Sequence, residues 1–197
     1  EYAFNWRESL PSLLSYAVYH GLLHPAPRTV HEQIFARLSG RSMPVSFKDV
    51  VEGRVVNRDN KQIQGDILSA VGALRSLGIA KGDKVAIVGL NSSRYLTLDV
   101  AIGLVGAVSV PLYYTSPVSE IRDIVSASGA KMLFVGAPKI LEYLCETGLT
   151  VPVVSFCNED FEESPMGCIG WSEFLAIGAG NDRYEDSPVE YGELATV

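Results

Sequence analysis

The stretch KGDKVAIVGLNSSRYLTLDVAIGLVGAVSVPL, residues 81–112, decides the fold. Its apolar run Val85–Val88 has the length and the β-branched content of a strand that is buried on both faces. A helical stretch follows from about Ser92 to Val105, with Asn91 as its expected N-cap, and Ala107–Leu112 has the composition of the next buried strand. Two short strands joined by a helix lie parallel, because a crossover and not a hairpin connects them.

The same alternation continues toward the C-terminus. Ser116-Pro117 predicts the start of a helix that runs to Ser128 and stops at Gly129. The later expected elements are a strand over 131–135, a helix over 138–146, a strand over 151–156 and a short helix over 171–177. Right-handed crossovers stack such strands into one open sheet with helices on both faces. The predicted fold class is therefore α/β, a doubly wound and mostly parallel sheet with flanking helices.

Upstream of this stretch, the pattern predicts one long amphipathic helix. Apolar residues recur every three or four positions over Ile63–Leu77, Asp59 and Gln62 are spaced like a capping box, and Gly78 is the expected stop. Residues 1–60 are otherwise expected to be irregular, apart from a helix over Trp6–Leu23 and a short hairpin over Val45–Val56.

These elements divide the chain into three parts. Residues 1–60 hold the N-terminal helix and the hairpin, and residues 61–157 form the parallel α/β core. Residues 158–197 hold a linker, a short helix and, at Leu194–Val197, the start of a further strand.

Composition excludes several classes of function. The net charge of -7, without a Lys/Arg-rich stripe, excludes a nucleic-acid partner that is held through its phosphates. Cys145, Cys157 and Cys168 have neither disulfide nor zinc-site spacing. No apolar run is long enough to span a bilayer and the N-terminus does not resemble a signal peptide, so a cytoplasmic location is expected.

The motifs that carry chemistry are equally sparse. No G-x-G-x-x-G follows Val85–Val88, and no G-x-x-x-x-G-K-[ST] or G-x-S-x-G occurs. His20 and His24 have the spacing of a helical metal pair, but Pro25 interrupts such a helix and no third ligand follows. The residues by themselves therefore specify a fold, no metal site and no active site.

A resemblance adds what the residues alone do not show. LGIAKGDKVAI (77–87), GAVSVPLY (106–113) and SGAKMLFV (128–135) resemble, in order and spacing, the N-terminal subdomain of the adenylate-forming (AMP-binding) acyl-CoA synthetases. The pattern from Tyr113 to Pro117 is most similar to long-chain fatty-acid–CoA ligases. The resemblance implies that a parent enzyme uses ATP, Mg²⁺ and CoA to turn a fatty acid or another carboxylate into its CoA thioester.

The same resemblance implies where the chemistry lies. In this family a run like Leu194–Val197 leads into the phosphate loop, so no catalytic residue can be placed on this chain, and the chain alone is expected to be inactive and to bind no cofactor tightly. The expected partner is the remainder of the same polypeptide, while a peripheral membrane contact and a homodimer stay open. Tyr113, Tyr114, Thr115 and Ser116, at the carboxyl end of a strand, are candidates for the wall of a substrate channel, with ordinary loop residues as the alternative reading.

Two alternatives are left by this reasoning. One is a non-enzymatic, flavodoxin-like binding module. The other is the N-terminal part of a non-ribosomal peptide adenylation domain or of a luciferase-like enzyme, which share the fold.

Overall fold

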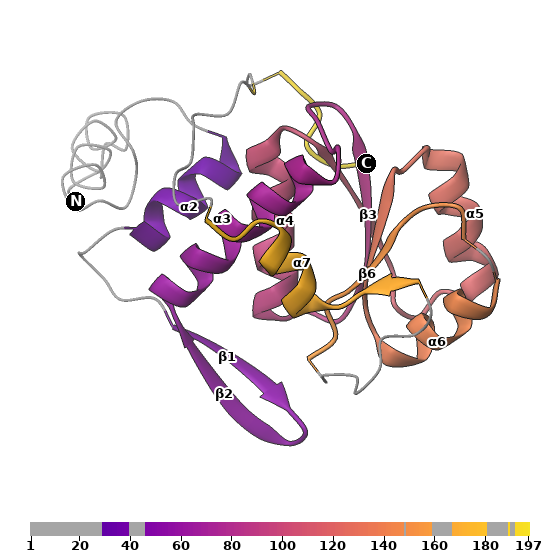
Figure 1. The fold of residues 1–197 in the computed structure, drawn as a ribbon, viewed down its shortest axis with the longest axis horizontal. Coiled ribbons are helices and arrows are strands. Elements are labelled where there is room, and N and C mark those ends of the chain that lie inside the picture. Colours follow the sequence, from indigo (N-terminus) through magenta and orange to yellow (C-terminus); the bar gives the residue numbers. More distant parts are fainter. Residues whose placement is uncertain (1–28, 40–45, 148, 159–166, 181–188, 190–191) are drawn as a thin grey trace, which may run out of the picture.

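The computed structural model describes residues 29–39, 46–147, 149–158, 167–180, 189 and 192–197 (Figure 1). The helix predicted over Trp6–Leu23 and the pair His20 and His24 lie outside the described residues. No helix in the described part of the chain is long and apolar enough to cross a bilayer.

A parallel sheet forms the centre of the molecule. Its strands follow one another in space as β4-β3-β5-β6-β7, and every neighbouring pair is parallel. The bounds are β3 (Lys84–Gly89), β4 (Val108–Leu112), β5 (Met132–Gly136), β6 (Val153–Ser155) and β7 (Cys168–Ile169). Four of these strands confirm the sequence prediction, whereas the short edge strand β7 was not predicted.

Helices cover both faces of this sheet (Figure 1). One face packs against α3 (Asn60–Ser76), α4 (Ser93–Val105) and α7 (Trp171–Ile177), and the other against α5 (Val118–Ser128) and α6 (Pro138–Thr147). Alternate strand residues divide between the two cores: Ile87 and Phe134 face α3 and α4, while Val88 and Leu133 face α5 and α6. The doubly wound α/β fold is therefore confirmed.

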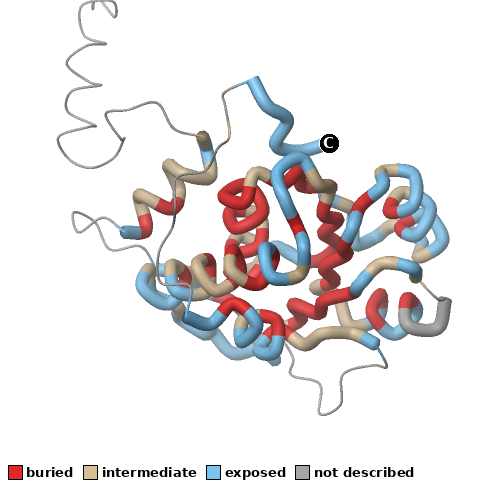
Figure 2. Tube along the Cα trace, turned by 45° about the horizontal axis from the view of Figure 1, so that its top comes forward, coloured by how far each residue is buried: buried red, intermediate tan, exposed pale blue. Residues whose placement is uncertain are grey.

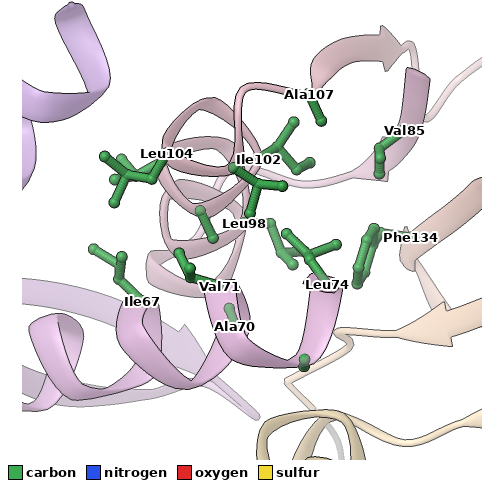
Figure 3. Close-up of a cluster of buried hydrophobic side chains, with 14 of the residues drawn as sticks. Ile67, Ala70, Val71, Leu74, Val85, Leu98, Ile102, Leu104, Ala107 and Phe134 are labelled. Carbon is green, nitrogen blue, oxygen red and sulfur yellow. The ribbon is translucent and has the colours of Figure 1, made fainter. Parts of the chain in front are cut away.

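The larger core lies between α3, α4 and the sheet. Figure 3 shows Ile67, Val71 and Leu74 of α3 turned toward Leu98 and Ile102 of α4. All five side chains are fully buried. Figure 2 shows α4 buried along most of its length, because it is enclosed by α3 on one side and the sheet on the other. The apolar second half of α4, residues 100–105, suits this central position.

The helix ends show which local signals the chain uses. The capping box is present, since the Gln62 N–H donates to the Asp59 carboxylate at 2.9 Å and the Asp59 N–H donates to the Gln62 side chain at 3.0 Å. The predicted cap of α4 was wrong by one position: Ser92 and not Asn91 is the N-cap, and its hydroxyl accepts the Tyr95 N–H at 3.1 Å. Either residue type can cap, so the sequence did not decide between them.

The region before α3 holds one helix that was not predicted, α2 (Val30–Ser39). Thr29 and Glu32 bond reciprocally at its start, with the Thr29 N–H donating to the Glu32 carboxylate at 2.8 Å. This T-x-x-E spacing was the available sequence signal. The expectation that residues 1–60 are irregular outside the Trp6–Leu23 helix and the hairpin is corrected at this point.

The predicted hairpin is confirmed and is longer than expected. It consists of β1 (Ser46–Val51) and β2 (Arg54–Asp59), which pair antiparallel with Val50 opposite Val55. Figure 1 shows that it projects away from the layered body. At the other end of the chain, Ala195 and Val197 bond to the backbone of Ser109 in β4, so the run predicted as a strand start meets the sheet edge in a parallel bridge.

Candidate functional site

A cavity of about 700 Å³ opens at the carboxyl ends of β3 and β4. After β3 the chain turns to α4 on one face, and after β4 it turns to α5 on the other. Parallel sheets bind ligands beyond the carboxyl ends of their strands, which is where this cavity lies. The cavity is lined by Gly89, Leu90, Asn91, Tyr95, Pro111, Leu112, Tyr113 and Tyr114.

Two glycines and one aromatic ring shape the side of the site that faces β5 and β6. Gly89 and Gly136 stand opposite each other in the β3–β5 ladder, and the ring of Phe156 lies against both. A Cβ on Gly89 would come within 2.6 Å of the ring, and a Cβ on Gly136 would overlap it. The Phe156 ring in turn meets the Tyr95 ring edge-on, with centroids 6.0 Å apart. Sequence reasoning missed this arrangement, although both strands end in the same Val-Gly pair.

The four predicted channel residues separate into two pairs. Tyr113 and Tyr114 line the cavity, with 82% and 50% of their surfaces exposed. Thr115 and Ser116 are not among the lining residues. The Ser116 N–H donates to the Tyr113 carbonyl at 3.1 Å, which closes the turn that leads into α5.

The cavity wall carries no charge among its described lining residues, none of which is Asp, Glu, Lys or Arg. The pKa of the Tyr95 phenol is raised by burial and further by the Asp99 carboxylate, so the phenol stays neutral at physiological pH. Without a cationic side chain, this wall does not by itself fit a triphosphate. Within the described ranges no three His, Cys, Asp or Glu side chains gather as a metal site would require. The residues instead suit an apolar ligand with a few polar contacts.

The loop that walls the cavity is also held from the hairpin side. The buried Asp49 carboxylate accepts the Ser93 N–H at 2.9 Å and the Ser93 hydroxyl at 2.5 Å. Arg58 of β2 lies 3.8 Å from that carboxylate and 2.8 Å from Asp66 of α3. Burial raises the pKa of Asp66, and Arg58 opposes this rise. Asp49 and Ser93 are 44 residues apart, so sequence patterns gave no signal for their contact.

The buried Arg94 side chain connects the first turn of α4 to the segment that follows β6. The Arg94 guanidinium donates to the Cys157 carbonyl and lies over the Trp171 ring, 5.5 Å from its centroid. These contacts fix the first turn of α4, from which Tyr95 reaches the cavity. Ser93, Arg94 and Tyr95 therefore connect the hairpin, the end of β6 and the cavity through one helical turn.

Comparisons with known proteins identify the family of the chain. Residues 62–177, more than half of the chain, match the family described as AMP-binding enzyme. The chain is 31% identical to the long-chain-fatty-acid–CoA ligase FadD15 of Mycobacterium bovis over 136 residues, which are 66% of this chain and 23% of that protein. It is 30% identical to the long chain acyl-CoA synthetase 5 of Arabidopsis thaliana over 155 residues, 74% of this chain and 23% of that protein. The chain thus spans about a quarter of the length of these curated relatives.

Solved structures show the same fold. The A-PCP didomain of the carboxylic acid reductase from Segniliparus rugosus, in complex with AMP, superposes with a TM-score of 0.67 at 17% identity, over 93% of this chain and 31% of that one. The adenylation domain of the carboxylate reductase from Mycobacterium chelonae gives a TM-score of 0.61 at 17% identity, over 94% of this chain and 36% of that one. The family match, the relatives and the shared fold together show that this chain belongs to the AMP-binding enzymes, the adenylate-forming acyl-CoA ligase family.

Proposed function

We propose that this chain forms the N-terminal part of an enzyme that activates a long-chain fatty acid with ATP and transfers the acyl group to CoA. The observation that carries the proposal is the uncharged, partly aromatic cavity of about 700 Å³ at the carboxyl ends of β3 and β4, in a chain whose relatives are named long-chain ligases. An alkyl chain requires such a wall, because every buried CH₂ contributes about 0.8 kcal/mol to binding.

The proposed reaction has two steps. A carboxylate oxygen of the fatty acid bonds to the α-phosphorus of ATP while the bond to the bridging oxygen of pyrophosphate breaks, and the thiolate of CoA then displaces AMP from the acyl carbon. Mg²⁺ would neutralise the charge that develops on the phosphates. In this proposal, Tyr95, Tyr113 and Tyr114 wall the acyl group and exclude water. Residues of the parent enzyme outside this chain hold the phosphates.

The 197 residues alone are proposed to be inactive, since the cavity wall offers no phosphate clamp among its described residues. Pyrophosphate exchange with a panel of fatty acids, and calorimetric titration with Mg·ATP, test this directly. We expect neither exchange nor tight binding. Exchange that stays with the chain through repeated purification would contradict the proposal.

The substrate assignment is tested in the parent enzyme by replacing Tyr113 and Tyr114 together with Ala. We expect the dependence of kcat/KM on acyl chain length to flatten, from roughly fourfold per CH₂ toward no dependence, while the KM for ATP stays unchanged. Tyr143→Ala is the matched control, because Tyr143 is a similarly exposed tyrosine on α6, outside the cavity. If the parent enzyme prefers an amino acid or an aryl acid, the proposal of a fatty-acid substrate is wrong. The membership of the chain in the AMP-binding family is not affected by that result.

The alternatives are less well supported. A flavodoxin-like module without catalysis is not favoured by the family match, and a peptide-adenylation or luciferase-like parent is not favoured by the names of the curated relatives. A cytoplasmic location, a peripheral membrane contact and a homodimer stay predictions.

A further inference from the structure

The hairpin β1–β2 meets the body through a few side chains: Phe47 packs against the larger core, Arg58 pairs with Asp66, and Asp49 is buried. Five of the six residues of β2 are exposed, and Asp49 is the buried residue of β1, with 7% of its surface accessible. Val50 and Val55, which face each other across the ladder, are 69% and 61% exposed. Asp49 is therefore the buried polar contact between the hairpin and the body.

Asp49 contacts the first turn of α4. One carboxylate oxygen accepts the Ser93 N–H and the other accepts the Ser93 hydroxyl, at 2.9 and 2.5 Å. Ser93 itself is 3% exposed, so both bonds are shielded from water. Hydrogen bonds to a buried carboxylate are roughly twice as strong as neutral ones. This pair is thus a strong link between the hairpin and the body.

The link ends at the loop that walls the acyl cavity. Leu90 and Asn91 line the cavity of about 700 Å³, and they also line a second cavity of about 310 Å³ that Asp49 and Val51 border from the hairpin side. The loop is therefore a partition between the two cavities. Its first residue is fixed by the β3 ladder, and Ser93, which follows its last residue, is fixed by Asp49.

We propose that Asp49 is a positioning residue for substrate binding: it ties the hairpin to Ser93 and thereby sets the position of the loop over residues 89–92, one wall of the acyl cavity. This inference rests on the proposed function in treating that cavity as the acyl site. Asp49 is not among the described residues that line the cavity of about 700 Å³, so it acts on the substrate only through the loop.

Asp66 supplies a matched control. It pairs with the same Arg58, at 2.8 Å, but belongs to α3, and its hydrogen bond and ion pair in the described structure go to Arg58 and not to the loop. Arg58 pairs with both carboxylates, so each of the variants Asp49→Ala and Asp66→Ala removes one partner of Arg58 and leaves the second in place. The two variants therefore disturb Arg58 in a comparable way. Only Asp49→Ala removes the acceptor of Ser93.

Amide hydrogen exchange of the 197-residue chain tests the link without any assay of function. In Asp49→Ala, we expect exchange of the Ser93 amide, which donates to Asp49, to speed up at least roughly tenfold. In Asp66→Ala it should stay within about twofold of the parent chain. Asp49→Asn, which retains an acceptor for the Ser93 N–H, should restore much of the protection. Equal acceleration in Asp49→Ala and Asp66→Ala would overturn the inference.

Steady-state kinetics of the parent enzyme test the connection to substrate. Asp49→Ala should raise the KM for the carboxylic acid roughly tenfold and leave the KM for ATP within about twofold. Asp66→Ala should leave both unchanged. Faster exchange at Ser93 without a change in the acid KM would overturn the positioning role.

Two further arms keep the outcomes separate. If Asp49→Ala does not fold, Ser93→Ala removes only the hydroxyl bond and should give the same shifts at smaller size, and their absence would overturn the inference. If the parent enzyme uses an acid other than a fatty acid, the proposed substrate fails, and the KM for that acid still decides whether Asp49 positions the wall.

Discussion

The two ends of the parallel sheet are built differently. At the amino ends, charged groups meet close to tight turns: Asp83 pairs with Lys131 at 2.8 Å, and the Lys84 ammonium donates to the Ser128 carbonyl at 2.8 Å. At the carboxyl ends, Gly89 and Gly136 lie under an aromatic ring beside an uncharged cavity. The same strands thus close the fold at one end and leave room for a ligand at the other. Ligands of parallel sheets collect beyond the carboxyl ends of the strands in the same way.

The largest effect is expected at the carboxyl end, from Phe156→Ala. The Phe156 ring is 1% exposed and touches Gly89, Gly136 and Tyr95, so its loss leaves a void next to the cavity. We expect the free energy of unfolding to fall by about 3–5 kcal/mol, as measured by urea denaturation. A cost below about 1 kcal/mol would show that the cavity wall collapses onto the void and that Phe156 does not shape the site.

The next effect comes from adding a single carbon at the same place. Gly136→Ala puts a methyl group into the space of the Phe156 ring and should cost about 1–3 kcal/mol of unfolding free energy. The control is Gly65→Ala on α3, where a methyl group meets nothing within 4 Å and should stabilise the helix by about 0.5–1 kcal/mol. Combining Gly136→Ala with Phe156→Leu should recover part of the loss, and strict additivity of the two changes would contradict the proposed contact.

At the amino end, Asp83→Asn should cost only about 0.2–1 kcal/mol at neutral pH, because the partner Lys131 is largely exposed. The hydrogen bond from Lys131, and then the bond from the Ala80 N–H, hold the pKa of Asp83 below its ordinary value of 3.8. A lowered pKa stabilises the fold above that ordinary value, and the stabilisation disappears as the pH falls through the pKa of the folded state. Denaturation of both proteins from pH 7 down to pH 2 should therefore show the difference shrink with acid, and a difference that grows would contradict this assignment.

The smallest effect is expected for Lys81→Ala. Lys81 and Glu193 are 2.6 Å apart, but their side chains are 42% and 35% exposed. Water and salt screen such a pair, so we expect a change below about 0.5 kcal/mol that fades in 1 M NaCl. A cost as large as that of Gly136→Ala would show that the two ends of the sheet differ less than proposed.

Much of the layered core was predictable because it is local. The apolar run Val85–Val88 and the helix that follows it can be buried in only one way once the crossover makes the strands parallel. The capping box of Asp59 and Gln62 fixed the start of α3 from four residues of sequence. The helix α2 escaped prediction although Thr29 and Glu32 form the same motif and Val30, Ile34 and Leu38 recur at helical spacing.

The site was less predictable, because its parts come from distant segments. Tyr113 and Tyr114 were placed at the cavity by their position after a buried strand. Their assignment to an acyl channel stays a prediction, and Thr115 and Ser116 fall outside the lining. No sequence pattern near Phe156 predicts that its ring packs against the ends of β3 and β5. Likewise, no pattern near Asp49 predicts its hydrogen bonds with Ser93. Such contacts depend on tertiary packing, which residue patterns do not encode one segment at a time.

The hairpin also has a consequence for the order of folding. Its strands are joined by Glu52 and Gly53 alone and can pair within about 1–10 μs, whereas β3 must wait for partners that begin at Val108 and Met132. Distant parallel pairing is slow because loop closure precedes any gain in contacts. The hairpin can therefore form early, while the burial of Asp49 waits until α4 exists to receive it. Substitutions at Asp49 should accordingly speed unfolding far more than they slow folding, as stopped-flow measurements can determine.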